Sequence, residues 1–93
     1  MKRMKRKILW RSDVAARVIQ MAERGTAASE RLASRAVEVV YSMGERGPPP
    51  NTTECGMRDS RPVFEYRIDG VRFLFHQDNN VIELVSIEFI RER

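Results

Sequence analysis

The sequence predicts an α+β domain in the order β-α-α-β-β-β, in which an N-terminal helical hairpin packs on one face of a small antiparallel sheet. Between Ser12 and Gly44 apolar residues recur every three or four positions, which is typical of amphipathic helices. From Val63 onward they alternate with polar residues, as in strands with one buried face. The 93 residues suffice for one domain. We therefore divide the chain into a basic tail, 1–7, and a single domain, 8–93.

The positive charge of the chain is concentrated in the tail. The formal net charge is +4, from 17 Lys and Arg against 13 Asp and Glu. Five of the 17 lie in the first seven positions, so the body carries 12 basic and 13 acidic side chains. The tail can add nonspecific, salt-sensitive attraction to RNA. Specific recognition has to come from the nearly neutral body.

The first elements are a short strand and a helix. Lys7 to Trp10 forms an apolar run that we expect to be a strand. Ser12 is a favourable N-cap, and Asp13 behind it suits the positive end of the helix dipole. Gly25 follows the last periodic position, where a glycine commonly ends a helix.

A second helix should follow, capped by Thr26 or Ser29 and ended by Gly44. Gly47-Pro48-Pro49-Pro50 is incompatible with a helix interior or a central strand. We find no periodicity from Gly44 to about Ser60, and we predict a long loop there. Loops of that length in a small domain are usually functional or mobile.

The last third of the chain predicts three strands. Val63–Ile68 and Val71–His76 alternate, and the Asp69-Gly70 pair between them is a strong hairpin signal. Val81–Ile90 is apolar on nearly both faces, as expected of a central strand. A two-residue turn pairs Ile68 with Val71 and sets the register of the whole hairpin.

That register places two arginines side by side on the face away from the helices. Arg67 lies opposite Arg72, and His76 is expected to be exposed on the same face near the strand end. Neighbouring arginines repel each other unless an anion lies between them. The anion can be an internal carboxylate, such as Glu65 or Glu88, which gives a solvated face with a local network. It can equally be a phosphate, which suits the guanidinium group and indicates an RNA-backbone site.

The composition excludes several classes of protein. No apolar run approaches the roughly 18 residues that span a bilayer, and Ile8–Trp10 is too short for a signal peptide. We therefore expect a cytoplasmic protein that does not interact with membranes. Cys55 is the only cysteine, which excludes an internal disulfide and a zinc site of cysteines. We expect no metal and no cofactor.

Two stretches then resemble a known family. Gly56-Met57-Arg58-Asp59, followed by Tyr66–Phe75, is similar to a signature of the RelE/ParE superfamily of bacterial toxin–antitoxin toxins. The order of elements resembles that family from about Lys7 to Arg93. The resemblance implies a partner antitoxin that covers the arginine face or the helical hairpin.

RelE-like members cut mRNA in the ribosomal A site without a metal, through attack of the 2′-hydroxyl on the adjacent phosphate. The resemblance implies that Arg67, Arg72 and Arg91 stabilise the phosphate charge. The candidates for the general base are His76 and Glu92. The candidate RNA-binding residues are Arg61, Arg93, Lys5 and Lys7.

The sequence also departs from the family pattern. The loop from Asn51 to Arg61 has no lysine, and Val71 stands where the signature has tyrosine. Three functions stay open for this reason. The first is a RelE-like endoribonuclease acting with ribosome and mRNA. The second is a ParE-like DNA gyrase inhibitor without nuclease chemistry, and the third is a degenerate member that only binds a partner.

Overall fold

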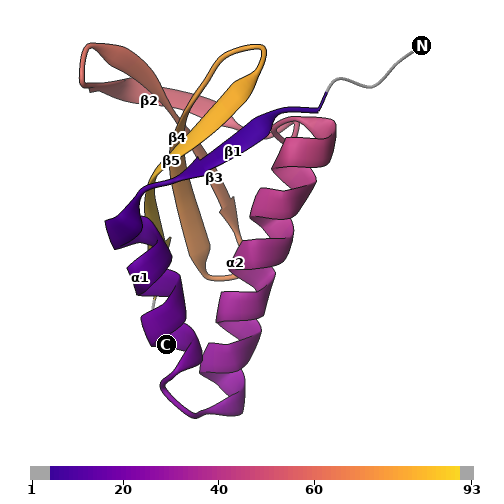
Figure 1. Cartoon of the computed structure of the whole chain (residues 1–93), viewed down its shortest axis with the longest axis vertical. Coiled ribbons are helices and arrows are strands. Elements are labelled where there is room, and N and C mark those ends of the chain that lie inside the picture. Colours follow the sequence, from indigo (N-terminus) through magenta and orange to yellow (C-terminus); the bar gives the residue numbers. More distant parts are fainter. Residues whose placement is uncertain (1–4, 91–93) are drawn as a thin grey trace.

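The computed structural model describes residues 5–90 and shows two helices packed against a five-stranded sheet (Figure 1). The elements are β1 (Lys7–Trp10), α1 (Ser12–Ala22), α2 (Ala27–Arg46), β2 (Thr53–Arg58), β3 (Arg61–Ile68), β4 (Val71–Gln77) and β5 (Val81–Phe89). The strands lie in the order β1-β5-β4-β3-β2. The predicted α+β class is confirmed.

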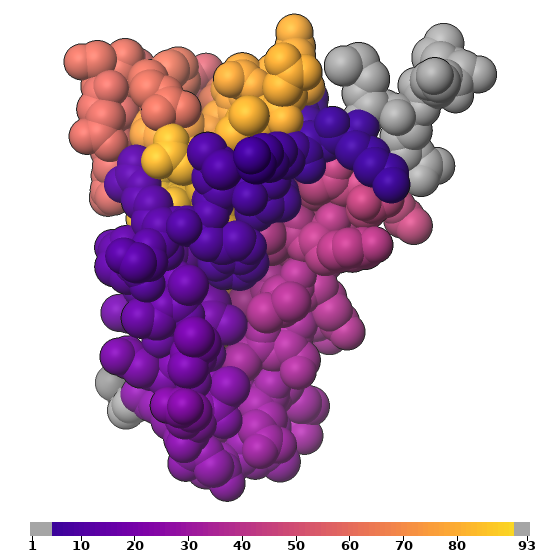
Figure 2. Space-filling model, in the orientation of Figure 1, coloured from indigo at the N-terminus to yellow at the C-terminus, as the bar shows by residue number. Residues whose placement is uncertain are grey.

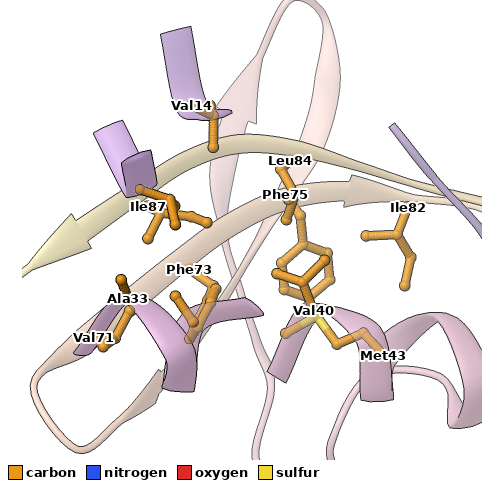
Figure 3. Close-up of a cluster of buried hydrophobic side chains, with 12 residues drawn as sticks. Val14, Ala33, Val40, Met43, Val71, Phe73, Phe75, Ile82, Leu84 and Ile87 are labelled. Atoms are coloured by element: carbon orange, nitrogen blue, oxygen red, sulfur yellow. The ribbon is translucent and has the colours of Figure 1, made fainter. Parts of the chain in front are cut away.

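The core lies between the helical hairpin and one face of the sheet (Figure 3). The central strands β4 and β5 contribute its largest side chains, including Phe73, Phe75 and Leu84, all fully buried. Val40 and Met43 of α2 pack against them. Burying side chains of this size is the main force that holds the helices on the sheet.

The predicted β3–β4 hairpin is confirmed residue by residue. Ile68 pairs with Val71, Tyr66 with Phe73, and Phe64 with Phe75. The two aromatic pairs stack with ring centroids 6.1 Å apart. Asp69 (φ 48°) and Gly70 (φ 81°) form the left-handed turn that fixes this register.

The helices begin close to the predicted positions, but α2 is longer than predicted. Thr26 is its N-cap, and its hydroxyl accepts the Ser29 N–H at 3.1 Å. The N-cap of α1 is Arg11, one residue before the predicted Ser12, and its side chain makes no capping hydrogen bond. The prediction that Gly44 ends α2 is wrong, because α2 continues to Arg46 and Gly47 (φ 85°) follows it.

Gly44 is needed inside α2 for a close approach to β1. A Cβ atom at this position would lie 3.2 Å from both the Arg6 carbonyl oxygen and the Ile8 side chain. The Arg6 N–H also donates to the Gly44 carbonyl at 2.8 Å. A glycine can therefore mark a tight helix–strand contact as well as a helix end.

The sheet differs from the prediction at both edges. The segment predicted to be a long loop contains β2, which pairs antiparallel with β3 and is irregular between Glu54 and Met57. All six β2 residues are exposed, so no apolar alternation marks the strand in the sequence. At the other edge β1 pairs parallel with β5, so the sheet is mixed and not purely antiparallel.

The two ends of the molecule are built differently. The β2–β3 and β4–β5 turns lie at one end, and the turn between α1 and α2 lies at the opposite end (Figure 1). The space-filling view shows α1 and α2 side by side over one face of the molecule (Figure 2). Within residues 5–90 the other face of the sheet has no helix over it, and it carries four of the predicted site residues, Arg61, Arg67, Arg72 and His76.

Candidate anion-binding face

Three groups of side chains lie on or beside the helix-free face of β3, β4 and β5. Nearest the β3–β4 turn is a charged row, named here the Arg72 network: Arg67, Glu65, Arg72 and Glu88. The middle row is apolar and almost fully buried: Val63, Leu74 and Val85. Nearest the β2–β3 turn is a second charged row, named here the Glu83 network: Arg61, Glu83, Arg11 and Asp59.

The Arg72 network resolves the repulsion between the two neighbouring arginines. Arg67 and Arg72 are direct cross-strand partners, as predicted. Glu65 accepts from the Nε of Arg67 at 3.0 Å and also from the Nε of Arg72. Arg72 reaches Glu88 as well, at 3.0 Å from Nη1 to Oε1. The arrangement is the internal Arg–Glu network that the sequence left open as one of two alternatives.

The electrostatics of this network are strongly coupled. Hydrogen bonds from Arg72 and then Arg67 hold the pKa of Glu65 below its ordinary value. Hydrogen bonds to Glu65 and Glu88 raise the pKa of Arg72 above its ordinary value. Two arginines and two glutamates give zero net charge. A phosphate that binds Arg72 must therefore compete with carboxylates already in place.

Arg67 is the more available of the two arginines. Its side chain is 63% exposed, against 24% for Arg72. Only its Nε takes part in a hydrogen bond within the described residues. The two Nη nitrogens are free to donate to a phosphate in the bidentate geometry that guanidinium favours.

The Glu83 network joins segments far apart in the sequence. Glu83 of β5 accepts from Arg11 at 3.1 Å and from Arg61 at 3.0 Å. Arg11 also reaches Asp59 in the β2–β3 turn at 3.3 Å. The hydrogen bond between Arg11 and Glu83 is the main cause of both pKa shifts: it raises the pKa of Arg11 and lowers the pKa of Glu83. The predicted RNA-binding residue Arg61 is thus engaged with a carboxylate.

The prediction that His76 is exposed is wrong. Its side chain is 1% exposed, beneath the β2–β3 turn. Its Nδ1 lies 2.9 Å from the Pro62 carbonyl oxygen, which can only accept, so the neutral ring carries its proton on Nδ1. Nε2 is buried, has no hydrogen-bond partner in the described chain and lies 3.9 Å from Asp59 Oδ2. A substrate cannot reach this nitrogen unless the turn opens.

The remaining predicted residues do not join the face as a group. Lys5 pairs with Glu45 at 3.6 Å, and Lys7 begins the edge strand β1. Arg91, Glu92 and Arg93 lie outside the described residues. Within residues 5–90, no three His, Cys, Asp or Glu side chains come close enough together to hold a metal ion.

Sequence reasoning missed most of the Glu83 network, and it did not identify Val63, Leu74 and Val85 as a buried row. Arg11 and Glu83 are 72 residues apart, and no short-range pattern relates them. The hairpin register places Val63 and Leu74 on the face away from the helices, where the structure has them, and Val85 joins them from β5. An apolar residue at such a position indicates that neighbouring side chains cover it.

Comparison with solved structures identifies the class of fold. One chain of a crystal structure described as the toxin–antitoxin complex RelBE2 from Mycobacterium tuberculosis superimposes on this protein with a TM-score of 0.70. The two are 12% identical, and the alignment covers 92% of this chain and 99% of that one. No protein-family model matches the chain, and no curated protein sequence is similar to it. The protein therefore has the RelE-like fold that its sequence predicts.

The helices give one further finding. Neither α1 nor α2 combines the length and the apolar character needed to cross a membrane.

Proposed function

We propose that the protein is the toxin of a bacterial type II toxin–antitoxin system, acting in the cytoplasm. The observation that carries this proposal is the fold shared with a chain of the RelBE2 complex over 92% of the present chain. The similarity of Gly56–Asp59 and Tyr66–Phe75 to the family signature supports it. The proposal includes a cognate antitoxin as binding partner, because the neighbour was solved as a toxin–antitoxin complex.

The activity we propose is RelE-like cleavage of mRNA at the ribosome. The 2′-oxygen attacks phosphorus, the bond to the 5′-oxygen breaks, and a 2′,3′-cyclic phosphate results. Arg67 stabilises the negative charge that builds up on the phosphate oxygens, because its Nη nitrogens are unengaged and exposed. A single well-placed donor of this kind contributes about 3–4 kcal/mol to the barrier.

The proton transfers have fewer candidates on this face. A base must take the 2′-hydroxyl proton, and an acid must protonate the 5′-oxygen. His76 is buried and can act only if the β2–β3 turn moves. Glu92, the other base candidate, lies outside the described residues. Among the predicted catalytic residues that lie within 5–90, Arg67 is therefore the one whose exposure supports direct contact with RNA.

A second function is favoured by a separate observation. Arg72 and Arg61 are engaged with carboxylates, and His76 is buried, so residues 5–90 offer few free groups for nuclease chemistry. An inhibitor needs only a complementary surface. A ParE-like protein that blocks DNA gyrase by binding would need no free catalytic groups on this face.

Expression of the chain in growing cells separates the two functions. Cells carrying the wild type, Arg67→Ala or Arg46→Ala are induced, and growth, mRNA cleavage by primer extension and the DNA-damage response are followed. Arg46 is the matched control, since it is exposed and forms no ion pair within residues 5–90. Rapid mRNA cleavage that Arg67→Ala abolishes supports the nuclease. A damage response with intact mRNA supports the gyrase inhibitor, and normal growth with the wild type contradicts both.

A further inference from the structure

His76, the only histidine of the chain, has a ring nitrogen that the folded chain leaves unused. Its side chain is 1% exposed, and Nδ1 carries the ring proton because it faces the Pro62 carbonyl oxygen. Nε2 therefore keeps a lone pair, and it has no hydrogen-bond partner within residues 5–90. A buried acceptor without a donor is unfavourable for the folded state. The site thus holds a basic nitrogen that stabilises nothing in the closed structure.

The β2–β3 turn covers this nitrogen. The turn projects at one end of the sheet (Figure 1). Asp59 lies at its centre, with Oδ2 3.9 Å from His76 Nε2. Asp59 (φ 53°) and Ser60 (φ 63°) both have the left-handed backbone conformation that is uncommon outside glycine. Access to Nε2 therefore depends on the position of this tight turn.

The strand that leads into the turn is loosely attached to the sheet. β2 is an edge strand, and within residues 5–90 it pairs with β3 alone. All six of its residues are exposed, and its pairing is irregular between Glu54 and Met57. Segments with few buried apolar contacts and exposed backbone hydrogen bonds open locally at a lower cost than the core. We expect the turn to open while β4 and β5 stay folded.

Arg11 ties the turn to the centre of the sheet. It lies between β1 and α1, and its Nη2 reaches Asp59 Oδ2 at 3.3 Å. Its Nε donates to Glu83 of β5 at 3.1 Å, and Arg61 holds the other oxygen of Glu83 at 3.0 Å. The Asp59 side chain is 66% exposed, so salt screens its attraction to Arg11. An exposed ion pair of this kind is weak enough to break without unfolding the chain.

We propose that His76 is a latent basic site: the β2–β3 turn covers it, Arg11 latches the turn through Asp59, and the turn opens while the rest of the sheet stays folded. Opening uncovers Nε2 on the face that also carries Arg67. The use of this nitrogen as the base in mRNA cleavage rests on the proposed function. The cover and its latch do not.

The test uses the full chain and diethyl pyrocarbonate, which modifies accessible neutral imidazole and gives a characteristic ultraviolet absorbance. Because His76 is the only histidine, that absorbance reports one side chain. Rates are divided by the rate for free N-acetylhistidine under the same conditions. The proteins are the wild type, Asp59→Asn and the control Asp69→Asn.

Asp69→Asn is a matched control because Asp69 also lies in a hairpin turn with a left-handed backbone (φ 48°) and pairs with one arginine, Arg35. Asparagine accepts this conformation as readily as aspartate, so both variants keep their turns. Arg11→Gln is a further variant that breaks the same latch from its other end.

Asp59→Asn and Arg11→Gln should be modified about two- to fivefold faster than the wild type, which corresponds to the loss of an exposed ion pair. Asp69→Asn should match the wild type. Raising NaCl from about 0.05 M to about 0.5 M should speed the wild type and leave Asp59→Asn unchanged. Equal rates in all four proteins overturn the latch.

Low concentrations of urea distinguish opening of the turn from unfolding of the whole chain. Opening a small exposed segment uncovers little surface, so the rate in the wild type should change little with urea. A rate that rises with urea as steeply as the unfolding equilibrium shows that His76 is reached only in the unfolded chain, and this overturns the cover.

The proposed function can fail separately from this site. If Asp59→Asn speeds modification but expression of the wild type does not slow growth, the cover stands and the toxin assignment falls. If the chain is toxic and the wild type, Asp59→Asn and Arg11→Gln are modified at equal rates, the cover falls and the toxin assignment stands.

Discussion

The two faces of the sheet are covered by different kinds of interaction. The helix-covered face buries large side chains such as Phe73 and Phe75 under α1 and α2. Among residues 5–90 the opposite face has three buried apolar side chains, and ion-pair networks lie on either side of them. Where no helix is available, arginine and glutamate side chains cover the strands with their aliphatic stems. Stability should therefore depend on packing on one face and on charge on the other.

Phe73→Ala should cause the largest loss of stability and so sharpen this contrast. Phe73 is fully buried and stacks on Tyr66 across the hairpin. Removing a buried phenylalanine typically costs about 3–5 kcal/mol through lost burial and the cavity left behind. A domain of this size has only about 5–15 kcal/mol in total. Urea unfolding followed by circular dichroism should show the midpoint fall sharply.

The control for Phe73→Ala is Phe73→Leu, which keeps most of the apolar volume. It should cost less than half as much as the alanine change. If Phe73→Ala lowers stability by less than about 1 kcal/mol, the packing of the helices on the sheet is not the main stabilising term.

Leu74→Ala tests the thin apolar row of the other face. Leu74 is 3% exposed between Val63 and Val85. Leucine-to-alanine changes in cores cost about 2–5 kcal/mol, and we expect the lower end, because long side chains over a small cluster can rearrange. Urea unfolding should show that Leu74→Ala lowers the free energy of unfolding by about 2 kcal/mol. A cost equal to that of Phe73→Ala would mean that the helix-free face is a second full core.

Acidification should weaken the ion pairs of the charged face before it affects the apolar packing of the helix-covered face. Arginine partners lower the pKa of Glu65 and Glu83 in the folded chain below the ordinary value of 4.5. The unfolded chain then binds protons first as pH falls. The stability from these pairs is present above about pH 4.5 and is lost as pH drops through the folded values.

The matched variant is Glu65→Gln/Glu83→Gln. It should be less stable than the wild type at pH 7 and should lose less stability than the wild type between pH 7 and about pH 3. Urea unfolding at several pH values measures both effects. Parallel pH profiles for the two proteins would show that these carboxylates contribute nothing to acid sensitivity.

The same contrast explains what could be predicted from the sequence. Strict alternation and the Asp69-Gly70 turn determine which residues of β3 and β4 meet the helices, so the packed face follows from local rules. The position of Glu65 beside Arg67 and Arg72 follows from that register too. The burial of His76 does not, because it depends on how Pro62 and the β2–β3 turn fold over the sheet. Contacts such as Arg11–Glu83 depend on the parallel pairing of β1 with β5, which no local pattern indicates.

Arg67→Ala should have the smallest effect on stability and the clearest effect on function. The side chain is 63% exposed and makes one hydrogen bond, so its loss should cost less than about 1 kcal/mol. Arg72→Ala should cost more, because Glu65 and Glu88 would each lose a partner. If both variants fold, as judged by circular dichroism, and only Arg67→Ala relieves growth inhibition, the exposed arginine contacts the target and Arg72 holds the face together. If Arg67→Ala is as toxic as the wild type, the arginine face is a stabilising network alone, and the functional surface lies elsewhere on the molecule.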